Sequence, residues 1–163
     1  VYTTAGSAEK CAACESLGAS TAINYREQDY VEQILALTEF QGVNVILDMV
    51  GGDYVERNIN VAAQDGRIVN IAFLQGANVE LNMLPVMLKR LTLTGSTLRP
   101  QSPSAKAAIA RALREKVWPL IESGQITPQI HATFAFAEVQ AAHELMESSV
   151  HIGKILLSMD STE

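Results

Sequence analysis

Runs of apolar residues recur along the chain at the spacing of alternating strands and helices. The clearest run covers residues 43–50, where mostly β-branched apolar side chains follow one another without alternating, broken by Asn44 and carrying the acid Asp48 near its end. This pattern predicts a central strand of a parallel sheet, covered on both faces. Gly51 and Gly52 follow the run, and glycine allows a sharp turn and a close ligand approach. Ligands of open α/β sheets lie beyond the carboxyl ends of the strands. A ligand site at Gly51 and Gly52 and a tight turn without a ligand both fit this stretch.

Further strands and helices alternate over the first hundred residues. Ser7, Asp29 and Asp53 have the spacing of helix N-caps, and the last two each have a glutamate three residues later. The predicted strands cover residues 1–4, 22–24, 67–72 and 91–97, and the predicted helices cover residues 8–17, 30–41, 54–62 and 84–90. Asp65 and Gly66 predict a turn before the strand over 67–72. This order predicts right-handed βαβ crossovers and a parallel α/β sheet.

An alanine-rich helix is predicted over residues 104–123, with Pro119 bending it or splitting off its last turn. After Gly124 the last forty residues have a different character. A strand is predicted within residues 126–136, a helix over 137–148 and a closing strand over 153–157. These segments do not continue the βαβ order. They predict a return segment that packs elsewhere, such as on another domain.

Composition and charge narrow the class of protein. The chain has 163 residues, of which 48% are apolar and 18% are charged, and this indicates one folded domain of ordinary size. The net charge is −6 and no basic cluster exceeds Lys89 and Arg90, so no nucleic-acid partner is expected. No apolar run approaches the roughly 18–20 residues needed to cross a bilayer, and no secretion signal is visible. We therefore expect no membrane partner and a cytoplasmic location.

The two cysteines, Cys11 and Cys14, form a single C-x-x-C pair. A structural zinc ion would need two further ligands, but the three histidines lie more than a hundred residues away without ligand spacing. The pair lies in a predicted helix, where residues three apart can share one buried face. Packing is therefore favoured over a redox pair, and no metal site is expected.

The residues after the first predicted strand bear on the choice of cofactor. In a dinucleotide-binding fold, an acid at the end of the second strand selects NAD, whereas small polar residues with a nearby cation admit the 2′-phosphate of NADP. Here Gly6 and Ser7 occupy this place, Lys10 lies one turn into the helix, and no acid ends the strand. If residues 1–4 form that second strand, NADPH is favoured. The equal alternative is that Ser7 only caps the helix and Lys10 is a solvated cation.

Other catalytic constellations are missing from the sequence. The G-x-G-x-x-G phosphate loop, expected one helix before such a strand, does not occur. No Ser/His/Asp group, carboxylate pair or metal cluster stands out. Asp48 ends a predicted strand, where a catalytic acid could lie, but it has no acidic partner nearby. A structural role in fixing the following turn is favoured for Asp48.

Nine segments, in order from one end of the chain to the other, resemble the zinc-independent quinone oxidoreductases. They are A-G-S-A-E-K-C (5–11), L-G-A (17–19), I-N-Y-R (23–26), L-D-M-V-G-G (47–52), D-G-R-I-V (65–69), A-F-L-Q-G (72–76), L-T-G-S-T-L-R (93–99), A-H-E-L-M-E (142–147) and H-I-G-K-I (151–155). This group is the ζ-crystallin-like branch of the medium-chain dehydrogenase/reductase superfamily. The length and order of the match make it more specific than any one motif.

The resemblance implies a Rossmann-like, doubly wound parallel sheet and a binding site for NADPH. Its members have a catalytic domain with a GroES-like barrel, then a Rossmann domain and a C-terminal return segment, and they pass hydride from NADPH to quinones or other conjugated carbonyls. By position, four residues would hold the adenosine 2′-phosphate end: Gly6, Ser7, Lys10 and Tyr25. The residues expected along the cofactor and near the nicotinamide are Val50, Gly51, Phe73, Leu74, Gln75, Gly95, Ser96 and Thr97.

The chain also departs from this family pattern. The catalytic domain, the first Rossmann strand and the glycine-rich loop are missing from it, and in the strand order 3-2-1-4-5-6 that first strand lies between the second and the fourth. The resemblance implies a Rossmann-like domain over residues 1–125, truncated at its N-terminus, and a return segment over residues 126–163 that packs on the catalytic domain.

Two classes of function remain open from the sequence. The first is the NADPH-binding portion of a quinone oxidoreductase that reduces a small quinone or enone, and the second is a non-catalytic dinucleotide-binding or crystallin-like structural module. A homodimer is expected through the edge strand at Leu91–Gly95, because residues 91–98 carry neither charge nor proline. A neighbouring chain's strand in the place of the missing first strand is the rival arrangement.

Overall fold

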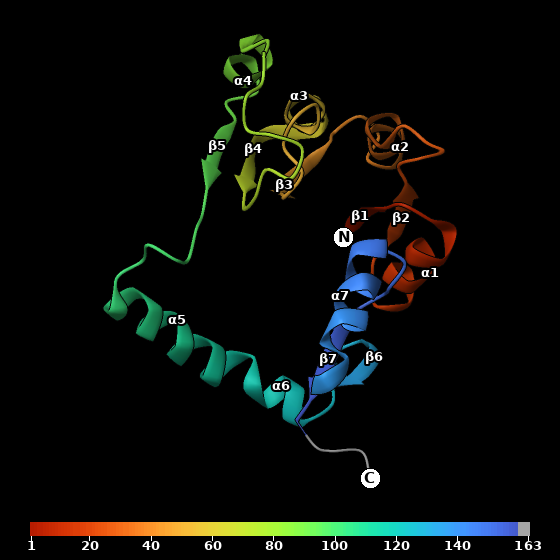
Figure 1. Cartoon of the computed structure of the whole chain (residues 1–163). Helices are drawn as coiled ribbons and strands as arrows, with labels where there is room; N and C mark the ends of the chain where they lie inside the picture. Colours follow the sequence, from red (N-terminus) through yellow and green to blue (C-terminus); the bar gives the residue numbers. More distant parts are fainter. Residues whose placement is uncertain (160–163) are drawn as a thin grey trace. The chain divides into compact units, whose positions relative to one another are not determined.

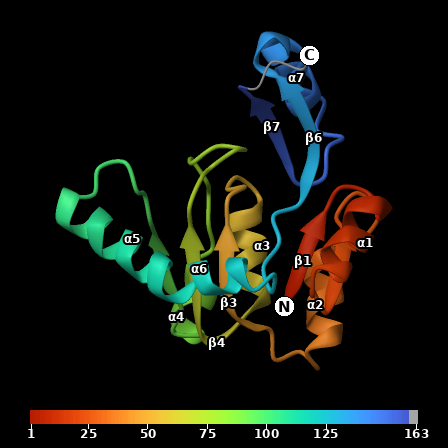
Figure 2. The ribbon, with the colours of Figure 1, turned by 90° about the horizontal axis from the view of Figure 1, so that it is seen from below.

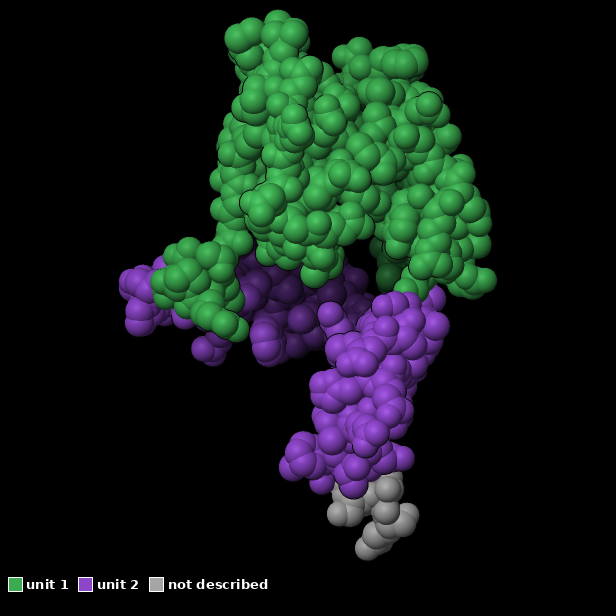
Figure 3. Space-filling view, turned by 45° about the horizontal axis from the view of Figure 1, so that its top comes forward, with its two compact units in different colours: residues 1–101 green, residues 102–163 purple. Residues whose placement is uncertain are grey.

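Strands and helices alternate through the first hundred residues of the computed structural model, which describes residues 1–159 (Figure 1). The elements of this part are β1 (Tyr2–Ala5), α1 (Ala8–Ser16), β2 (Thr21–Asn24), α2 (Tyr30–Leu37), β3 (Val43–Asp48), α3 (Tyr54–Val61), β4 (Ala62–Asn70), α4 (Leu84–Leu88) and β5 (Thr92–Gly95). They belong to the first of two compact units, residues 1–101 (Figure 3). The predicted order of strands and helices is confirmed.

The strands of the first unit form two parallel sheets. β1 pairs with β2, and β3, β4 and β5 pair in that order. The two sheets share no hydrogen-bonded ladder, so β1 and β3 each have a strand partner on one side. This division agrees with the strand order implied by the resemblance, in which the missing first strand belongs between them. The α/β class and the parallel pairing are confirmed.

Two clusters of buried side chains hold helices against these sheets. Ile23, Tyr30, Ile34 and Val61 form the first cluster, which links β2 and α2 to the end of α3. Val55, Ile59, Ala62 and Ile68 form the second, between α3 and β4. Ile46 of β3 packs against both clusters. The core therefore lies on the α2 and α3 side of β3.

The prediction that residues 43–50 form a central strand with both faces covered is wrong for this structure. β3 lies at one edge of its sheet, and Val45 and Leu47 are 65% and 63% exposed. Side chains of a strand alternate between its faces, so Ile46 and Asp48 point to the helices while Val45 and Leu47 point to a face that this unit leaves open.

Two of the three predicted helix caps are confirmed. The Ser7 hydroxyl accepts a hydrogen bond from the backbone N–H of Lys10 at 3.3 Å, and Asp29 Oδ1 accepts one from Val31 at 2.7 Å. The prediction for Asp53 is wrong, because its side chain makes no cap hydrogen bond. Asp53 has helical backbone angles (φ −63°, ψ −17°), whereas a capping side chain needs an extended backbone to reach back to the helix amides.

The predicted turn at Asp65 and Gly66 lies inside β4 instead of before it. The strand begins at Ala62, and its register with β3 shifts between the Val43 and Val45 pairs. Asp65 has a φ of 60° at this irregularity. An irregularity of this kind places extra residues in one strand without ending the pairing. The turn signal therefore marks an interruption within one strand.

The second unit begins at Ser102 and contains a long helix and a smaller sheet. Its elements are α5 (Pro103–Lys116), α6 (Trp118–Glu122), β6 (Ile130–Ala135), the 3₁₀ helix η1 (Phe136–Glu138), α7 (Val139–Ser148) and β7 (Lys154–Ser158). The predicted splitting at Pro119 is confirmed, since α5 ends before Val117 and Pro119 lies in the first turn of α6. Contrary to the expected break in pattern, β6 and β7 pair in parallel around α7.

The predicted domain boundary after residue 125 remains a prediction, and the end of the expected return segment, residues 160–163, lies outside the described residues. None of the helices over residues 1–159 combines the length and the apolar character required to span a bilayer.

Candidate functional site

The carboxyl ends of β3, β4 and β5 meet at one edge of their sheet, because the three strands are parallel (Figure 2). The segments after these strands contain eight of the residues predicted to contact the cofactor. They are Val50 and Gly51 after β3, Phe73, Leu74 and Gln75 after β4, and Gly95, Ser96 and Thr97 at the end of β5. The structure thus brings these predicted residues together, and we call this region the cofactor edge.

Backbone hydrogen bonds join two loops of the cofactor edge. The N–H of Leu74 donates to the carbonyl of Met49 at 3.1 Å, and the N–H of Gln75 donates to that of Val50 at 2.8 Å. In the opposite direction, the N–H of Gly52 donates to the carbonyl of Gly76 at 2.9 Å. Three bonds over so few residues hold the loop after β3 at a fixed distance from the loop after β4.

The two loops leave no room for a side chain at Gly51. Its φ is +69°, and a Cβ added there would lie 2.7 Å from both the Gly76 carbonyl oxygen and Phe73 Cδ1. Only glycine fits this combination of left-handed backbone and contact. The glycine predicted from the sequence is therefore required by the loop itself, whether or not a ligand is bound.

Asp48 fixes the turn that carries Val50 and Gly51. The residue is 3% exposed, and its Oδ1 accepts hydrogen bonds from the N–H groups of Val50 at 2.7 Å and Gly51 at 3.2 Å. Its Oδ2 accepts a hydrogen bond from Asn70 Nδ2 at 2.9 Å. These contacts agree with the turn-fixing role favoured from the sequence.

A shallow hollow of about 330 Å³ opens beside β4 and β5 at the same edge, lined by Asn70, Ile71, Ala72, Phe73, Gly95, Ser96 and Thr97. Ile71 and Phe73 are 44% and 47% exposed. The lining contains no carboxylate, imidazole, thiol or amine. Such a surface can bind and orient a flat, weakly polar group, but it offers no strong acid, base or nucleophile.

The other four predicted residues gather at the ends of β1 and β2. Gly6 follows β1 and Tyr25 follows β2, and a Cβ on Gly6 would lie 2.7 Å from the Tyr25 hydroxyl. Ser7 caps α1, Lys10 lies in the first turn of that helix, and the two residues share the cap hydrogen bond. We call Gly6, Ser7, Lys10 and Tyr25 the polar cluster.

Two charged residues near the polar cluster were not singled out from the sequence. A Cβ on Gly6 would lie 3.5 Å from Arg26 Nε, so this guanidinium places a positive charge beside Gly6 and Tyr25. Hydrogen bonds from its own backbone N–H and from the Ser7 hydroxyl lower the pKa of Glu9. Arg26 directly follows Tyr25 at a strand end, and this position in the sequence could have suggested that Arg26 belongs to the same cluster.

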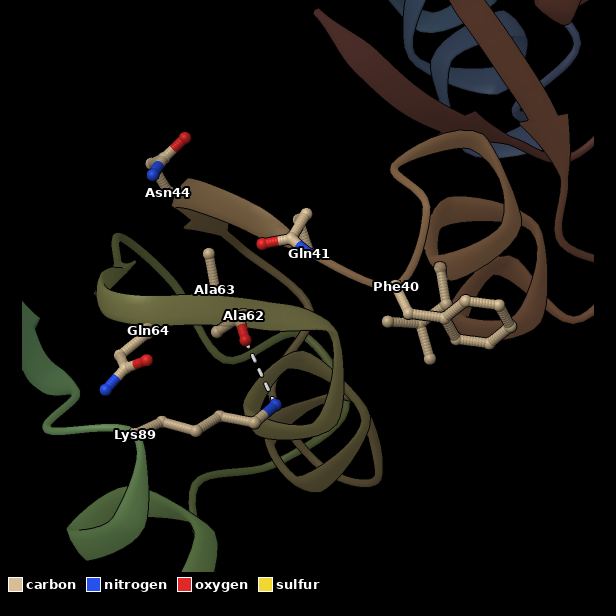
Figure 4. Close-up of a pocket in the computed structure, with 9 residues that line it drawn as sticks. Phe40, Gln41, Asn44, Ala62, Ala63, Gln64 and Lys89 are labelled. Atoms are coloured by element: carbon tan, nitrogen blue, oxygen red, sulfur yellow. Dashed lines mark hydrogen bonds between the residues drawn. The ribbon is translucent and has the colours of Figure 1, made fainter.

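A second hollow, of about 400 Å³, lies beside the amino-terminal part of β4, remote from the predicted residues, and Lys89 is its cationic residue (Figure 4). Lys89 Nζ donates to the carbonyl oxygens of Ile59 at 3.1 Å, Asn60 at 2.7 Å and Ala62 at 3.0 Å. Burial lowers the pKa of Lys89. An ammonium group has three donors, and all three are used at the end of α3. Lys89 therefore acts as a helix cap in this hollow.

The cysteine pair fits the packing interpretation. Cys11 is buried, Cys14 is half-buried, and both are free thiols. Burial raises the pKa of Cys11, and a protonated thiol is a poor nucleophile and metal ligand. Among residues 1–159, no three histidine, cysteine or acidic side chains are grouped so that they could hold a metal ion. That the protein works without zinc remains a prediction.

Comparison with known proteins gives consistent matches over the whole chain. Residues 17–157 match the family described as zinc-binding dehydrogenase. Quinone oxidoreductase-like protein 2 of Bos taurus is 33% identical over 98% of this chain and 45% of its own length. Quinone oxidoreductase 1 of Escherichia coli (strain K12) is 31% identical over 94% of this chain and 47% of its own length. The crystal structure of an NAD-dependent alcohol dehydrogenase superposes with a TM-score of 0.80 at 27% identity, over 98% of this chain and 44% of that one. The chain spans about half the length of these relatives.

Proposed function

The chain belongs to the zinc-binding dehydrogenase family, as the cofactor-binding part of a medium-chain dehydrogenase/reductase, and from this premise we propose that it binds NADPH. In the complete protein, NADPH would supply a hydride to a quinone or another conjugated carbonyl. The acceptor then needs only a proton from water, so neither zinc nor a strong protein acid is required.

The observation that carries the proposal is the arrangement of the cofactor edge. Gly51 lets the turn after β3 pack closely against Phe73, and the hollow that Phe73 helps to line has apolar and small polar residues. These features suit the flat, uncharged nicotinamide ring. The protein positions the cofactor, and the cofactor supplies the hydride. We assign the binding and orientation of the ring to Val50, Gly51 and residues 73–75.

The polar cluster supports the choice of NADPH over NADH. The Tyr25 hydroxyl and the Arg26 guanidinium offer a donor and a positive charge beside Gly6, and Lys10 in the first turn of α1 adds a further cation to this part of the chain. Charge-assisted hydrogen bonds of this kind are those that bind phosphate groups. Glu9 adds a negative charge to the first turn of α1. The preference for NADPH therefore requires that attraction of the 2′-phosphate by the cations exceeds its repulsion by Glu9.

The test is to measure cofactor binding and turnover with the full-length gene product. We expect NADPH to bind more tightly than NADH in a fluorescence titration, and NADPH to be oxidised when 1,4-benzoquinone is added. Tight NADPH binding without any turnover across quinones and enones would favour the non-catalytic dinucleotide-binding module. Binding of neither nucleotide would overturn the proposal.

A further inference from the structure

Asn70, the last residue of β4, links all three segments of the cofactor edge. Its side-chain Nδ2 donates to Asp48 Oδ2 at 2.9 Å, which connects it to the turn after β3. Its backbone carbonyl accepts a hydrogen bond from the N–H of Ser96 at 3.0 Å, which connects it to the end of β5. The same carbonyl would lie 3.1 Å from a Cβ on Gly95. One residue thus touches both neighbouring segments.

The carboxylate of Asp48 depends on Asn70 for its orientation. Oδ1 is held by two backbone N–H groups, of Val50 and Gly51, whereas Oδ2 has the Asn70 amide as its donor. A buried carboxylate needs donors for both oxygens, because a buried acceptor left without a partner is costly. Removing the Asn70 amide would therefore free the carboxylate to rotate away from Val50 and Gly51.

The network also determines which ligand group the edge can accept. The N–H groups of Val50 and Gly51 are used by Asp48, and those of Gly52, Leu74 and Gln75 are used by carbonyls of the facing loop. A phosphate group needs free N–H donors, and here they are already bonded beside a carboxylate. The edge thus disfavours the charged portion of a dinucleotide and leaves its surface to an uncharged portion.

We propose that Asn70 is a positioning residue, which holds Asp48, the turn at Val50 and Gly51, and Ser96 in one fixed arrangement for the uncharged end of the cofactor. This inference rests on the proposed function, since it assigns Asn70 a role in the same site. Asn70 does not need to touch the cofactor to act in this way.

The sharpest test changes the charge at Asn70 and then restores the pair by exchanging the two residues. In Asn70→Asp, two carboxylates would face each other at the place of the present 2.9 Å hydrogen bond. The double variant Asp48→Asn/Asn70→Asp places an amide opposite a carboxylate again, with the roles exchanged. Asn44→Asp, an exposed position on β3, is the control for adding one negative charge to the same sheet.

The readouts in the full-length protein are the dissociation constant for NADPH and the hydrogen exchange of the Val50 and Gly51 amides. We expect Asn70→Asp to weaken NADPH binding about tenfold or more, as for the loss of a charge-assisted hydrogen bond, and to speed exchange at both amides. The exchanged pair should recover most of both losses, and Asn44→Asp should show neither.

Failure of this inference can be told apart from failure of the proposed function. If the unmodified protein binds neither NADPH nor NADH, the proposed function fails, and amide exchange in the variants still decides whether Asn70 fixes the turn. If NADPH binds with unchanged affinity to Asn70→Asp, the positioning role is overturned. It is also overturned if the exchanged pair restores thermal stability but not NADPH affinity.

Discussion

Gly51 gives the clearest prediction for a single residue, because it combines a positive φ with the absence of room for a side chain. In Gly51→Ala, the left-handed backbone should cost about 1–2 kcal/mol, and overpacking against Phe73 and Gly76 about 1–3 kcal/mol more. Gly124→Ala is the matched control, since Gly124 has a similar φ of +74° with nothing within 4 Å of an added Cβ. Thermal unfolding should show a larger loss of stability for Gly51→Ala than for the control. NADPH titration should show a loss of affinity for Gly51→Ala only. Equal effects of the two changes would contradict this account of the turn.

Lys10 should discriminate between the two nicotinamide cofactors. If its ammonium group meets the 2′-phosphate, Lys10→Ala should weaken NADPH binding by roughly ten- to a hundredfold, the value of one charge-assisted hydrogen bond of about 1.5–3 kcal/mol, and leave NADH binding almost unchanged. Titrations of both cofactors with the full-length protein measure this, with Lys116→Ala in the last turn of α5 as the control. Equal losses for NADPH and NADH would show that Lys10 does not contact the 2′-phosphate.

Tyr30 carries a prediction about stability. Its hydroxyl donates to Asn58 Oδ1 at 2.9 Å, and both residues are buried, at 4% exposure each. Burial raises the pKa of Tyr30, so the hydroxyl keeps its proton at neutral pH. Tyr30→Phe should lower the free energy of unfolding by about 1–3 kcal/mol, because Asn58 loses its donor. Denaturant unfolding would test this against Tyr25→Phe at an exposed tyrosine, and comparable losses would contradict the argument.

At the scale of single residues, the sequence was informative where one position imposes a local constraint. The Ser7 cap and the turn-fixing role of Asp48 could be predicted, because the N–H groups that they bind lie two or three residues away. The position of Gly51 at a strand end was visible, but its contacts with Phe73 and Gly76 come from another loop. Asn70 could not be predicted, because its partners come from the other two strands. The register that places Asn70 opposite Gly95, and within reach of Asp48, is set by the pairing of whole strands.

At the scale of elements, Lys89 ties the end of α3 to the segment before β5. Its ammonium group uses three carbonyl oxygens at the helix end, where a positive charge is also favoured by the helix dipole. Lys89→Met should lower the free energy of unfolding by about 2 kcal/mol, as for the loss of hydrogen bonds from a charged donor. Arg90→Met is the control, because its ion pair with Asp65 is exposed and exposed ion pairs contribute little to stability. A smaller loss for Lys89→Met than for Arg90→Met in denaturant unfolding would contradict this.

The ends of helices and strands could be predicted where a residue at the end itself, such as a proline, determines them. Pro119 divides α5 from α6 as expected, because proline removes a donor and collides with the preceding turn. The irregularity at Asp65 was not predictable. The same residues can form a turn or an interruption within a strand, and pairing with β3 on either side of Asp65 decides between the two.

For the whole molecule, we predict that the protein needs no metal ion. Cys11 and Cys14 lie on one turn of α1. Among residues 1–159, no further metal-ligating side chain lies close enough to complete a site with them. Elemental analysis of the purified full-length protein should find no stoichiometric zinc, and a chelator should leave quinone-dependent NADPH oxidation unchanged. One tightly held zinc ion per chain that is lost in Cys11→Ser would contradict the prediction.

The last prediction concerns assembly through β5. This strand lies at the edge of its sheet and all four of its residues are exposed, and an uncharged edge without proline can pair with a second chain. In a strand, successive backbone N–H groups point to opposite sides. Ser96 donates to Asn70, so the Thr94 N–H also points to β4, whereas the Leu93 N–H points outward.

We therefore expect a homodimer through β5 in the full-length protein, and Leu93→Pro should make it monomeric by removing an outward donor. Light scattering at high concentration measures the mass, and circular dichroism confirms that the variant stays folded. Thr94→Pro should instead damage the pairing with β4 and lower thermal stability. A monomeric unmodified protein would rule out the dimer. A dimer that survives in Leu93→Pro would indicate another interface.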